Sequence, residues 1–248
     1  MLFSSEKIIV LESTESTNNY AMALIRNGQS INENAVFALE QTNGKGRRGK
    51  DWKSRKSENI ILSIMLQMQW LPVSYQFRLS VAAALGCYDL ISKYIPSGTT
   101  IKWPNDIFIN DSKAGGILIE NVIKGTLWQW TVIGIGININ QINFEEYNFH
   151  AVSLKQITGK DYDIMKLAEQ LHESVLKRIS ELKSGNFPKM INEYNENLFG
   201  KNRLVKLKAQ NVVFKTKIIA VSASGQLITQ DVFERHFNFD EVEYKEFL

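Results

Sequence analysis

Residues 41–56 read QTNGKGRRGKDWKSRK, and this stretch decides whether the chain has a dinucleotide-binding fold. Its glycines match the G-x-G-x-x-G pattern that follows a strand in dinucleotide-binding folds. That pattern should open a helix whose N-terminus holds a pyrophosphate, but polar residues and then another apolar run follow here. No Gly-Lys-Ser/Thr sequence closes the stretch as a Walker loop either. The stretch therefore predicts an anion-binding loop and argues against a doubly wound domain.

Positive charge is concentrated in this loop. Residues 44–56 hold seven Lys or Arg and one Asp, a net charge of +6, whereas the whole chain carries +3. Backbone amides and guanidinium groups can surround a phosphate, and an exposed Trp52 could stack on a base. The alternative is a solvated basic loop. We expect the loop to be mobile when empty, because like charges repel and glycines hold little shape.

Size and composition indicate a globular protein of one large domain with room for a small second one. The chain has 248 residues, of which 44% are hydrophobic and 22% charged. Its apolar runs, at 60–66 and 131–139, are shorter than the roughly 20 residues of a membrane span. We therefore expect a cytoplasmic protein.

Cys87 lies on an apolar helical stretch and is expected to be a buried packing thiol. The three histidines are scattered, which argues against a zinc site.

Periodicity predicts an α+β fold. Helices are expected over 18–26, 76–94, 164–183 and 187–198, and strands over 8–11, 35–41 and 60–66. Consecutive antiparallel strands are expected at 100–103, 106–109, 115–121 and 128–140. From about Gly200 the chain shows short strands of period two, which are expected over 203–209, 212–221, 225–232 and 241–247. We expect a mixed or antiparallel sheet with helices over 1–198 and a small β-domain over 199–248.

Four further motifs are ambiguous when taken singly. KWPND at 102–106 offers a lysine, an amide and a carboxylate for phosphate and magnesium, but taken alone it is better explained as a simple turn. SKAGG at 112–116 places Lys113 before two glycines that would let a ligand approach the backbone, although most lysines point to water. The alternating glycines of GIGIN at 134–138 are explained either by packing within the fold or by a need for space beside a ligand. STN at 16–18 caps a helix and leaves polar side chains free.

In this order, STN, QTNGKGRRGKDW, KWPND, SKAGGILIE and GIGIN resemble a bacterial-type biotin–protein ligase. The resemblance covers about residues 8–140, and the β-domain after 200 agrees with that family's C-terminal domain. It implies a class II aminoacyl-tRNA-synthetase-like mixed sheet with helices, plus a small C-terminal SH3-like β-barrel. The implied activity joins biotin to ATP as biotinyl-5'-AMP, releases pyrophosphate, and transfers biotin to a lysine of a biotin carboxyl carrier domain.

The resemblance also implies roles for individual residues, with Arg47 and Lys113 as the catalytic cations. The biotin site would comprise Ser16, Thr17, Asn18, Gln41, Lys45, Gly46, Arg47, Lys113, Gly115 and Gly116. The ATP and adenylate site would comprise Gly44, Arg47, Arg48, Trp52, Lys102, Asn105, Asp106 and Asn138, with Asp106 as the magnesium ligand. ATP with Mg²⁺ and biotin would be substrates, and no permanently bound cofactor is expected.

Two departures from the family pattern stand out. Lys45 occupies a loop position where many relatives have arginine, which keeps the charge but loses the bidentate fork. Only a short segment precedes Ser16, so we expect no helix-turn-helix domain and no DNA binding. The expected partners are biotin and the carrier domain, with no membrane, and the chain is expected to be a monomer or homodimer.

Three alternatives remain open. A lipoate–protein ligase or octanoyltransferase of the same superfamily also places an acyl group on a carrier lysine. A nucleic-acid-binding module could use residues 44–56 on phosphates, and its binding would be steeply salt-dependent. An inactive biotin-binding relative is the third.

Overall fold

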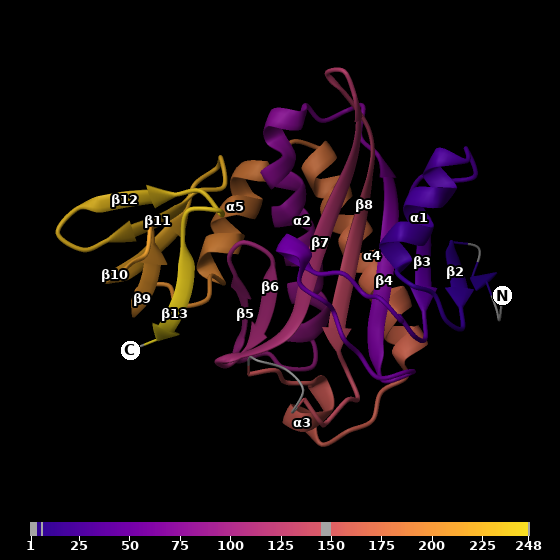
Figure 1. Cartoon of the computed structure of the whole chain (residues 1–248), viewed down its shortest axis with the longest axis horizontal. Helices are drawn as coiled ribbons and strands as arrows, with labels where there is room; N and C mark the ends of the chain where they lie inside the picture. The colour runs from indigo at the N-terminus through magenta and orange to yellow at the C-terminus, as the bar shows by residue number, and fades with distance from the viewer. Residues whose placement is uncertain (1–3, 6, 145–149, 248) are drawn as a thin grey trace.

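The computed structural model describes residues 4–5, 7–144 and 150–247, and these form two sheets (Figure 1). The larger sheet has eight strands in the order β1-β2-β3-β4-β8-β7-β6-β5, and the smaller has five in the order β12-β11-β10-β9-β13. In the larger sheet β2 and β3 are parallel and the other neighbours are antiparallel, so the predicted mixed sheet is confirmed. Its strands are β1 (Ser4–Ser5), β2 (Ile8–Leu11), β3 (Ala35–Ala38), β4 (Asn59–Gln67), β5 (Thr99–Lys102), β6 (Asp106–Ile109), β7 (Ser112–Lys124) and β8 (Leu127–Asn138).

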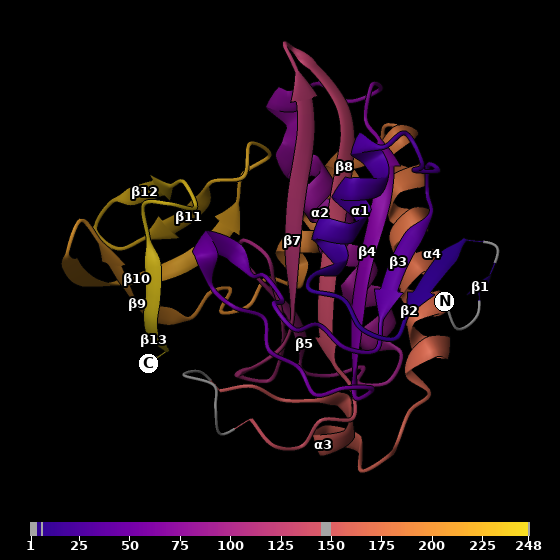
Figure 2. The same cartoon turned by 45° about the vertical axis from the view of Figure 1, so that its right-hand side comes forward.

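The helices lie in two layers. The helices of the described residues are α1 (Thr17–Arg26), α2 (Gln76–Ser92), α3 (Leu154–Thr158), α4 (Ile164–Lys183) and α5 (Phe187–Glu196), with 3-10 turns η1 (Arg47–Gly49) and η2 (Val73–Tyr75). In both views α2 and α4 lie behind the sheet and α1 lies in front of it (Figures 1 and 2).

Alternation along the central strands separates a packing face from a site face. On β8, Ile133, Ile135 and Ile137 join the main core with α2 and α4. Because side chains alternate along a strand, Gly134 and Gly136 face the other side, which α1 and the 41–56 loop cover. The site is therefore built on the face that is poorer in apolar side chains.

Local chemistry sets the limits of α1. The Ser16 hydroxyl caps the helix by accepting from the Asn19 amide at 3.4 Å. The helix ends at Asn27, and Gly28 follows with φ +69°. The predicted end of this helix at Arg26 is confirmed, and the helix begins at Thr17, one residue earlier than predicted.

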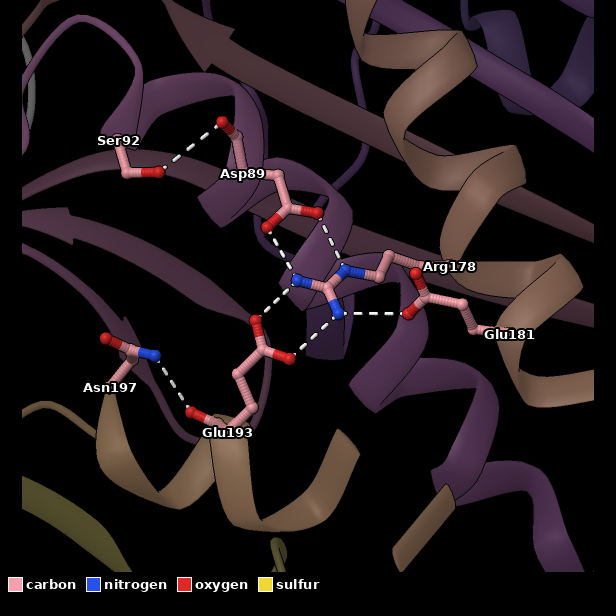
Figure 3. Close-up of polar contacts among 6 residues, drawn as sticks. All are labelled: Asp89, Ser92, Arg178, Glu181, Glu193 and Asn197. Carbon is pink, nitrogen blue, oxygen red and sulfur yellow. Dashed lines mark hydrogen bonds and ion pairs between the residues drawn. The ribbon is translucent and has the colours of Figure 1, made fainter. Parts of the chain in front are cut away.

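A single arginine ties three helices of the other layer together (Figure 3). The Arg178 guanidinium of α4 binds Asp89 of α2 at 2.7 Å and Glu181 of its own helix at 3.0 Å, and it also binds Glu193 of α5. These carboxylates raise the pKa of Arg178 above its usual range. This network ties α2, α4 and α5 to one another, away from the site.

The C-terminal residues form a separate antiparallel sheet, which confirms the predicted β-structure of this part of the chain. Its strands are β9 (Leu204–Ala209), β10 (Val212–Val221), β11 (Leu227–Gln230), β12 (Glu234–Phe237) and β13 (Glu243–Phe247). We predicted one strand over 225–232 and no strand at 234–237. The chain instead turns at Asp231, whose carboxylate accepts from the Phe233 amide at 2.9 Å. The polar sequence ERHF hides β12 from a hydrophobic pattern.

Other predicted boundaries shift by a few residues. The strand expected over 35–41 ends at Ala38, and Gln41 instead forms an isolated bridge with Thr14. The helices expected to end at 94 and 198 end at Ser92 and Glu196. The short elements α3 and β1 were not predicted because they are below the length at which a period is visible.

The structure also bears on the predicted burial of Cys87 and on membrane-spanning helices. Cys87 is fully buried on α2, which confirms the packing role, and burial raises its pKa above the usual range. Among the helices of the described residues, none is long and apolar enough to cross a membrane.

Candidate functional site

Strand register places the site residues in two parallel rows across the sheet. The first row joins Ser63 of β4, Gly134 of β8 and Leu118 of β7. The second row runs two residues further along, through Ile61, Gly136, Gly116 and Asp106 on four strands. The glycines leave a hollow in each row, and one side chain from above fills each hollow.

Asn18 fills the first hollow. A Cβ built on Gly134 would lie 2.2 Å from Asn18 Oδ1, so only glycine leaves room there. The Asn18 amide donates to Glu120 Oε2 at 2.7 Å and to Leu118 O at 3.4 Å. Its oxygen lies 2.6 Å from the Ser63 hydroxyl. Asn18 is 4% exposed, and these contacts hold it firmly.

Thr17 and Gln41 lie beside Asn18. The Thr17 backbone N–H donates to Gln41 Oε1 at 2.7 Å, which fixes the orientation of that carboxamide. The Thr17 hydroxyl lies 2.7 Å from Ser63 Oγ and 3.0 Å from Gln41 Oε1. Since Gln41 Oε1 faces Thr17, its Nε2 points toward Gly44, where an added Cβ would meet it at 2.7 Å. Gly44 therefore lets the loop pass close to Gln41.

Trp52 fills the second hollow. A Cβ on Gly136 would lie 2.3 Å from the indole ring, and one on Gly116 would lie 3.3 Å from it. We expected Trp52 to be an exposed loop residue; it is folded inward because the two glycines provide a flat surface for the ring. The indole Nε1–H is buried and has no acceptor among the described residues. A buried donor without a protein partner can bind an acceptor that enters the cavity, on a ligand or on water.

These side chains line an inner cavity of about 60 Å³. Neutral hydrogen-bonding groups and cations both reach it. The cavity is lined by Ser16, Thr17, Asn18, Gln41, Lys45, Gly46, Arg47, Trp52, Ile61, Asn105, Lys113, Gly116, Ile117, Leu118, Gly134, Ile135 and Gly136. Most of the predicted biotin-site residues are therefore brought together around one cavity.

Three cations reach the inner cavity. Arg47 Nη1 donates to Asn105 Oδ1 at 3.2 Å, and Lys113 Nζ lies 2.7 Å from Asp106 Oδ1. Burial, and next the neighbouring Arg48, lower the pKa of Arg47, which still leaves a guanidinium charged. The third cation, Lys45, donates to Asn19 Oδ1 at 3.1 Å. Positive groups held together and partly desolvated are suited to an anionic ligand.

A larger cavity of about 250 Å³ adjoins the first. It lies between the start of α2, the 104–105 turn, β7 and the C-terminal sheet domain, which contributes Ser224 and Phe239. Arg47 and Asn105 line both cavities. Arg47 therefore stands where a ligand spanning the two spaces would pass.

Several predicted residues do not line either cavity. Lys102 Nζ lies among aromatic rings, 4.6 Å from the centroid of Phe108 and 4.8 Å from that of Tyr244, and burial lowers its pKa. Asn138 donates to Val152 O at 3.2 Å and to Lys113 O at 3.4 Å, so it braces the chain beside the site. At Gly44 and Gly115 the absence of a side chain lets the backbone lie close to Trp52 O and Gly136 O, respectively.

Arg48 points to the C-terminal domain. Its guanidinium donates to Asp240 Oδ1 at 2.8 Å and to Phe239 O at 2.6 Å. Its backbone is left-handed, with φ 56° and ψ 37°, a conformation that costs a non-glycine residue about 1 kcal/mol or more. Arg47 meanwhile lies over the Phe239 ring, with Cζ 5.1 Å from its centroid. Figure 2 shows this part of the loop between β7 and the C-terminal sheet.

Four residues at or near the site were not predicted from the sequence. Ser63 is the one hydroxyl residue in the apolar run of β4, and Glu120 is a lone acid in an apolar stretch of β7. A lone polar residue in a buried strand is a usable signal, because such groups need partners. Phe239 and Asp240 carried no signal, since they contact the loop only through the tertiary fold.

The described residues offer few ligands for a metal ion. No group of three or more His, Cys, Asp or Glu side chains suited to a metal occurs in the part of the chain that the structure describes. Asp106 is one carboxylate, already paired with Lys113. Mg²⁺ often uses one or two carboxylates together with substrate phosphates, so these residues fit a metal that arrives with a nucleotide.

Comparisons with known proteins agree with this geometry. The model of the biotin/lipoate A/B protein ligase family matches residues 10–138. The biotin--[acetyl-CoA-carboxylase] ligase of Mycobacterium tuberculosis is 31% identical over 188 residues, 75% of this chain and 68% of that protein. The bifunctional ligase/repressor BirA of Bacillus subtilis is 28% identical, over 89% of this chain and 67% of that protein.

A solved structure shows the same fold along the whole chain. The biotin protein ligase from Aquifex aeolicus, in complex with biotin and ATP, superposes with a TM-score of 0.82 at 22% identity, over 98% of this chain and 100% of that one. The family match covers both rows of the site and the basic loop. The chain therefore belongs to the biotin/lipoate A/B protein ligase family.

Proposed function

We propose that this chain is an ATP-dependent biotin–protein ligase. The observation that carries the proposal is the inner cavity, which combines neutral hydrogen-bonding groups (Thr17 and Gln41) with fixed cations (Arg47 and Lys113). Biotin has the matching form, an uncharged urea head and a carboxylate tail. Lipoate has an apolar dithiolane head, which would leave the Gln41 Nε2 amide without a partner, and unpaired polar groups discriminate strongly.

In the first step the biotin carboxylate attacks the α-phosphate of ATP, and pyrophosphate leaves. Two anions must approach each other, and negative charge grows on the phosphate oxygens. Arg47 and Lys113 would hold the anions and stabilise this charge, with no covalent enzyme intermediate. Arg47 lines both cavities, which supports a place at the phosphate that joins the two substrates.

The other assigned residues take supporting roles in this proposal. Trp52 Nε1 would donate to a ligand oxygen, and its ring would lie near the adenine. Mg²⁺ would enter with ATP, held by its phosphates and by Asp106 or Asn105, and would neutralise phosphate charge. Lys102 and Asn138 would act on ATP through the chain segments they brace.

In the second step the ε-amine of a carrier-domain lysine attacks the mixed anhydride, an amide forms and AMP leaves. The 41–56 loop would keep water from the anhydride until the lysine arrives. The proposed partner is the biotin carboxyl carrier domain of a carboxylase, and the proposed location is the cytoplasm. We assign residues 1–198 to the catalytic domain and 199–248 to the small C-terminal domain.

Exchange of labelled pyrophosphate into ATP tests the first step. The assay is run separately with biotin, lipoate and octanoate at equal concentration. Exchange that depends on biotin supports the proposal. Exchange with lipoate or octanoate alone would assign the chain to the other branch of its family, and no exchange with any acid would leave a binding protein.

A further inference from the structure

A buried side chain binds the downstream end of the basic loop (residues 41–56). Gln141 lies three residues after the end of β8 and is 2% exposed. Its Oε1 accepts the Arg55 backbone N–H at 3.1 Å, and Arg55 is an exposed residue of the loop. This hydrogen bond therefore joins the loop to the end of the strand that carries two glycines of the site.

The orientation of the Gln141 amide is fixed by its partners. One end meets two donors, the Arg55 N–H and the Asn59 amide at 2.6 Å, so that end is the oxygen. Asn59 is itself oriented, because its oxygen accepts the Ile139 N–H at 2.9 Å. The other end of Gln141 donates to Asn143 O at 2.8 Å. The oxygen that binds the loop is thus held by β4 and by the segment after β8.

Other contacts near this end of the loop hold it less closely. The Ser57 N–H donates to Leu39 O at 2.8 Å, but this bond lies two residues further along the chain. Lys56 forms an ion pair with Glu12 whose side chains are 47% and 65% exposed, and such pairs contribute little in water. Without Gln141, the fixed end of the loop would therefore move from residue 55 to residue 57.

The upstream end of the loop is bound through its backbone. The N–H groups of residues 42 and 43 donate to the carbonyl oxygens of residues 14 and 15, at 3.0 and 2.9 Å. Residues 44–54 therefore lie between two fixed ends, and they place Arg47 at the junction of the two cavities and Trp52 in its hollow. Releasing the downstream end lengthens the span that can move, and each added residue gains conformational entropy when the loop opens.

We propose that Gln141 is a positioning residue. By binding the loop at Arg55 it keeps Arg47 and Trp52 over the site and reduces the fraction of molecules in which the loop is open. Loop opening in the empty chain does not depend on which ligand the site takes. The inference rests on the proposed function for one consequence alone, the retention of the adenylate beneath the closed loop.

Limited proteolysis with trypsin measures loop opening in the ligand-free chain, because the loop is rich in Lys and Arg and cleavage requires an open segment. Gln141→Met keeps the length of the side chain and removes its hydrogen bonds. We expect nicking within residues 45–50 to become about five- to tenfold faster, which corresponds to the loss of about one hydrogen bond. Cleavage outside the loop reports unfolding of the whole chain and should change no more than in the control variant.

Asn140→Leu is the matched control. Asn140 precedes Gln141, and its side-chain amide also makes two hydrogen bonds, one to Tyr162 O at 2.8 Å and one from the Tyr162 N–H at 3.0 Å. Neither bond reaches the loop, so we expect a similar loss of stability with unchanged nicking of the loop. Equal acceleration of loop nicking in this control would overturn the proposal.

Arg55→Pro tests the same hydrogen bond from the side of the loop. Proline removes the N–H that Gln141 accepts, and the residue is exposed, so this variant decides the question if Gln141→Met does not fold. We expect a similar acceleration of nicking within residues 45–50. The double variant should be nicked no faster than the faster single variant, whereas independent effects would add and would contradict a shared bond.

Adenylate kinetics separate loop positioning from damage to the chemistry. While the closed form predominates, a tenfold rise in a small open fraction changes the closed fraction little. Gln141→Met should therefore release biotinyl-AMP about five- to tenfold faster, with the single-turnover rate of adenylate formation at saturating substrates nearly unchanged. Nicking and release equal to those of the unaltered chain would overturn the role of Gln141 and leave the proposed function intact. Faster nicking of Gln141→Met, together with an unaltered chain that forms no adenylate, would support that role and overturn the proposed function.

Discussion

The cavity floor and the basic loop contribute to one site but are built in opposite ways. The floor is a set of buried groups on α1 and the sheet, with Ser63 and Thr17 at 0% and 3% exposure and each bound to a neighbour. The loop is a cationic segment with a left-handed Arg48, held by partly exposed contacts. Hydrogen-bonding groups are thus placed on the sheet and on α1, and most of the charge is placed on a loop, the kind of segment that moves more readily in proteins. Variants of the two regions should therefore differ in which property they change.

The largest effect is expected from the loop. Arg47→Ala removes the cation that lines both cavities, and we expect biotinyl-AMP formation to slow by about a hundred- to a thousandfold, as when other charge-stabilising donors are lost. Rapid-quench single-turnover kinetics measure this rate. Thermal unfolding should be unchanged, because the loop adds little to the core. Lys50→Ala is the control, an exposed cation of the same loop. An Arg47→Ala enzyme with a normal rate would remove Arg47 from the chemistry.

Lys113 lies on strand β7 of the sheet but carries a charge, as the loop residues do. Its variants should therefore combine the effects expected for the two regions. Lys113→Ala should slow adenylate formation by about a hundredfold. It should also destabilise the fold, because it leaves the Asp106 carboxylate without its ion-pair partner at 2.7 Å. Adding Asp106→Asn should recover the melting temperature without recovering the rate. Recovery of both would show that Lys113 acts only on structure.

Two glycines of β8 give the sharpest comparison, because the same substitution affects a different region at each. Gly134→Ala places a methyl 2.2 Å from Asn18, which the floor holds in place, and should cost about 1–3 kcal/mol of stability. Gly136→Ala places a methyl 2.3 Å from the Trp52 ring, which the loop can carry away. That variant should keep its stability, lose activity and show altered tryptophan fluorescence.

Chemical denaturation and adenylation rates of the two variants, measured side by side, check this. Each serves as the control for the other, since both add one methyl to the same strand. Equal losses of stability would mean that the loop is as rigid as the floor.

The smallest effect is expected where the loop meets the C-terminal domain. The Arg48–Asp240 ion pair has side chains 42% and 72% exposed, and such pairs contribute little in water. Asp240→Arg should therefore speed adenylate release by only about two- to fivefold. The difference should shrink at high salt, because surface charges are screened. The double variant Arg48→Asp with Asp240→Arg should restore slow release. A stopped-flow release assay measures this, and failure of the swap to restore it would mean that the pair does not hold the loop.

Much of the site could be predicted from the sequence because its chemistry is local. Ser16 is a helix cap three residues before the amide that it binds, and the antiparallel run from β5 to β8 is connected by short turns. The grouping of Thr17, Gln41, Arg47 and Lys113 at one cavity followed from the resemblance. Composition and periodicity alone left each motif ambiguous.

The remainder depended on register between distant strands. Ser63 faces Gly134 because β4 pairs with β8, and no local pattern specifies that pairing or its alignment. The inward position of Trp52 depends on the same alignment, which brings Gly136 beside Gly116. The contact of Arg48 with Asp240 joins residues 192 positions apart. Such contacts are set by the tertiary fold, which single-sequence patterns do not encode.

Biotin transfer to a carrier domain tests the central claim most directly. The chain is incubated with ATP, Mg²⁺, biotin and a purified biotin carboxyl carrier domain, and the intact mass of the carrier is measured. We predict that the carrier gains one biotinyl group on its acceptor lysine, and that a carrier with this lysine changed to arginine gains none. A carrier whose mass does not change, under conditions in which a known biotin–protein ligase modifies it fully, would contradict the account.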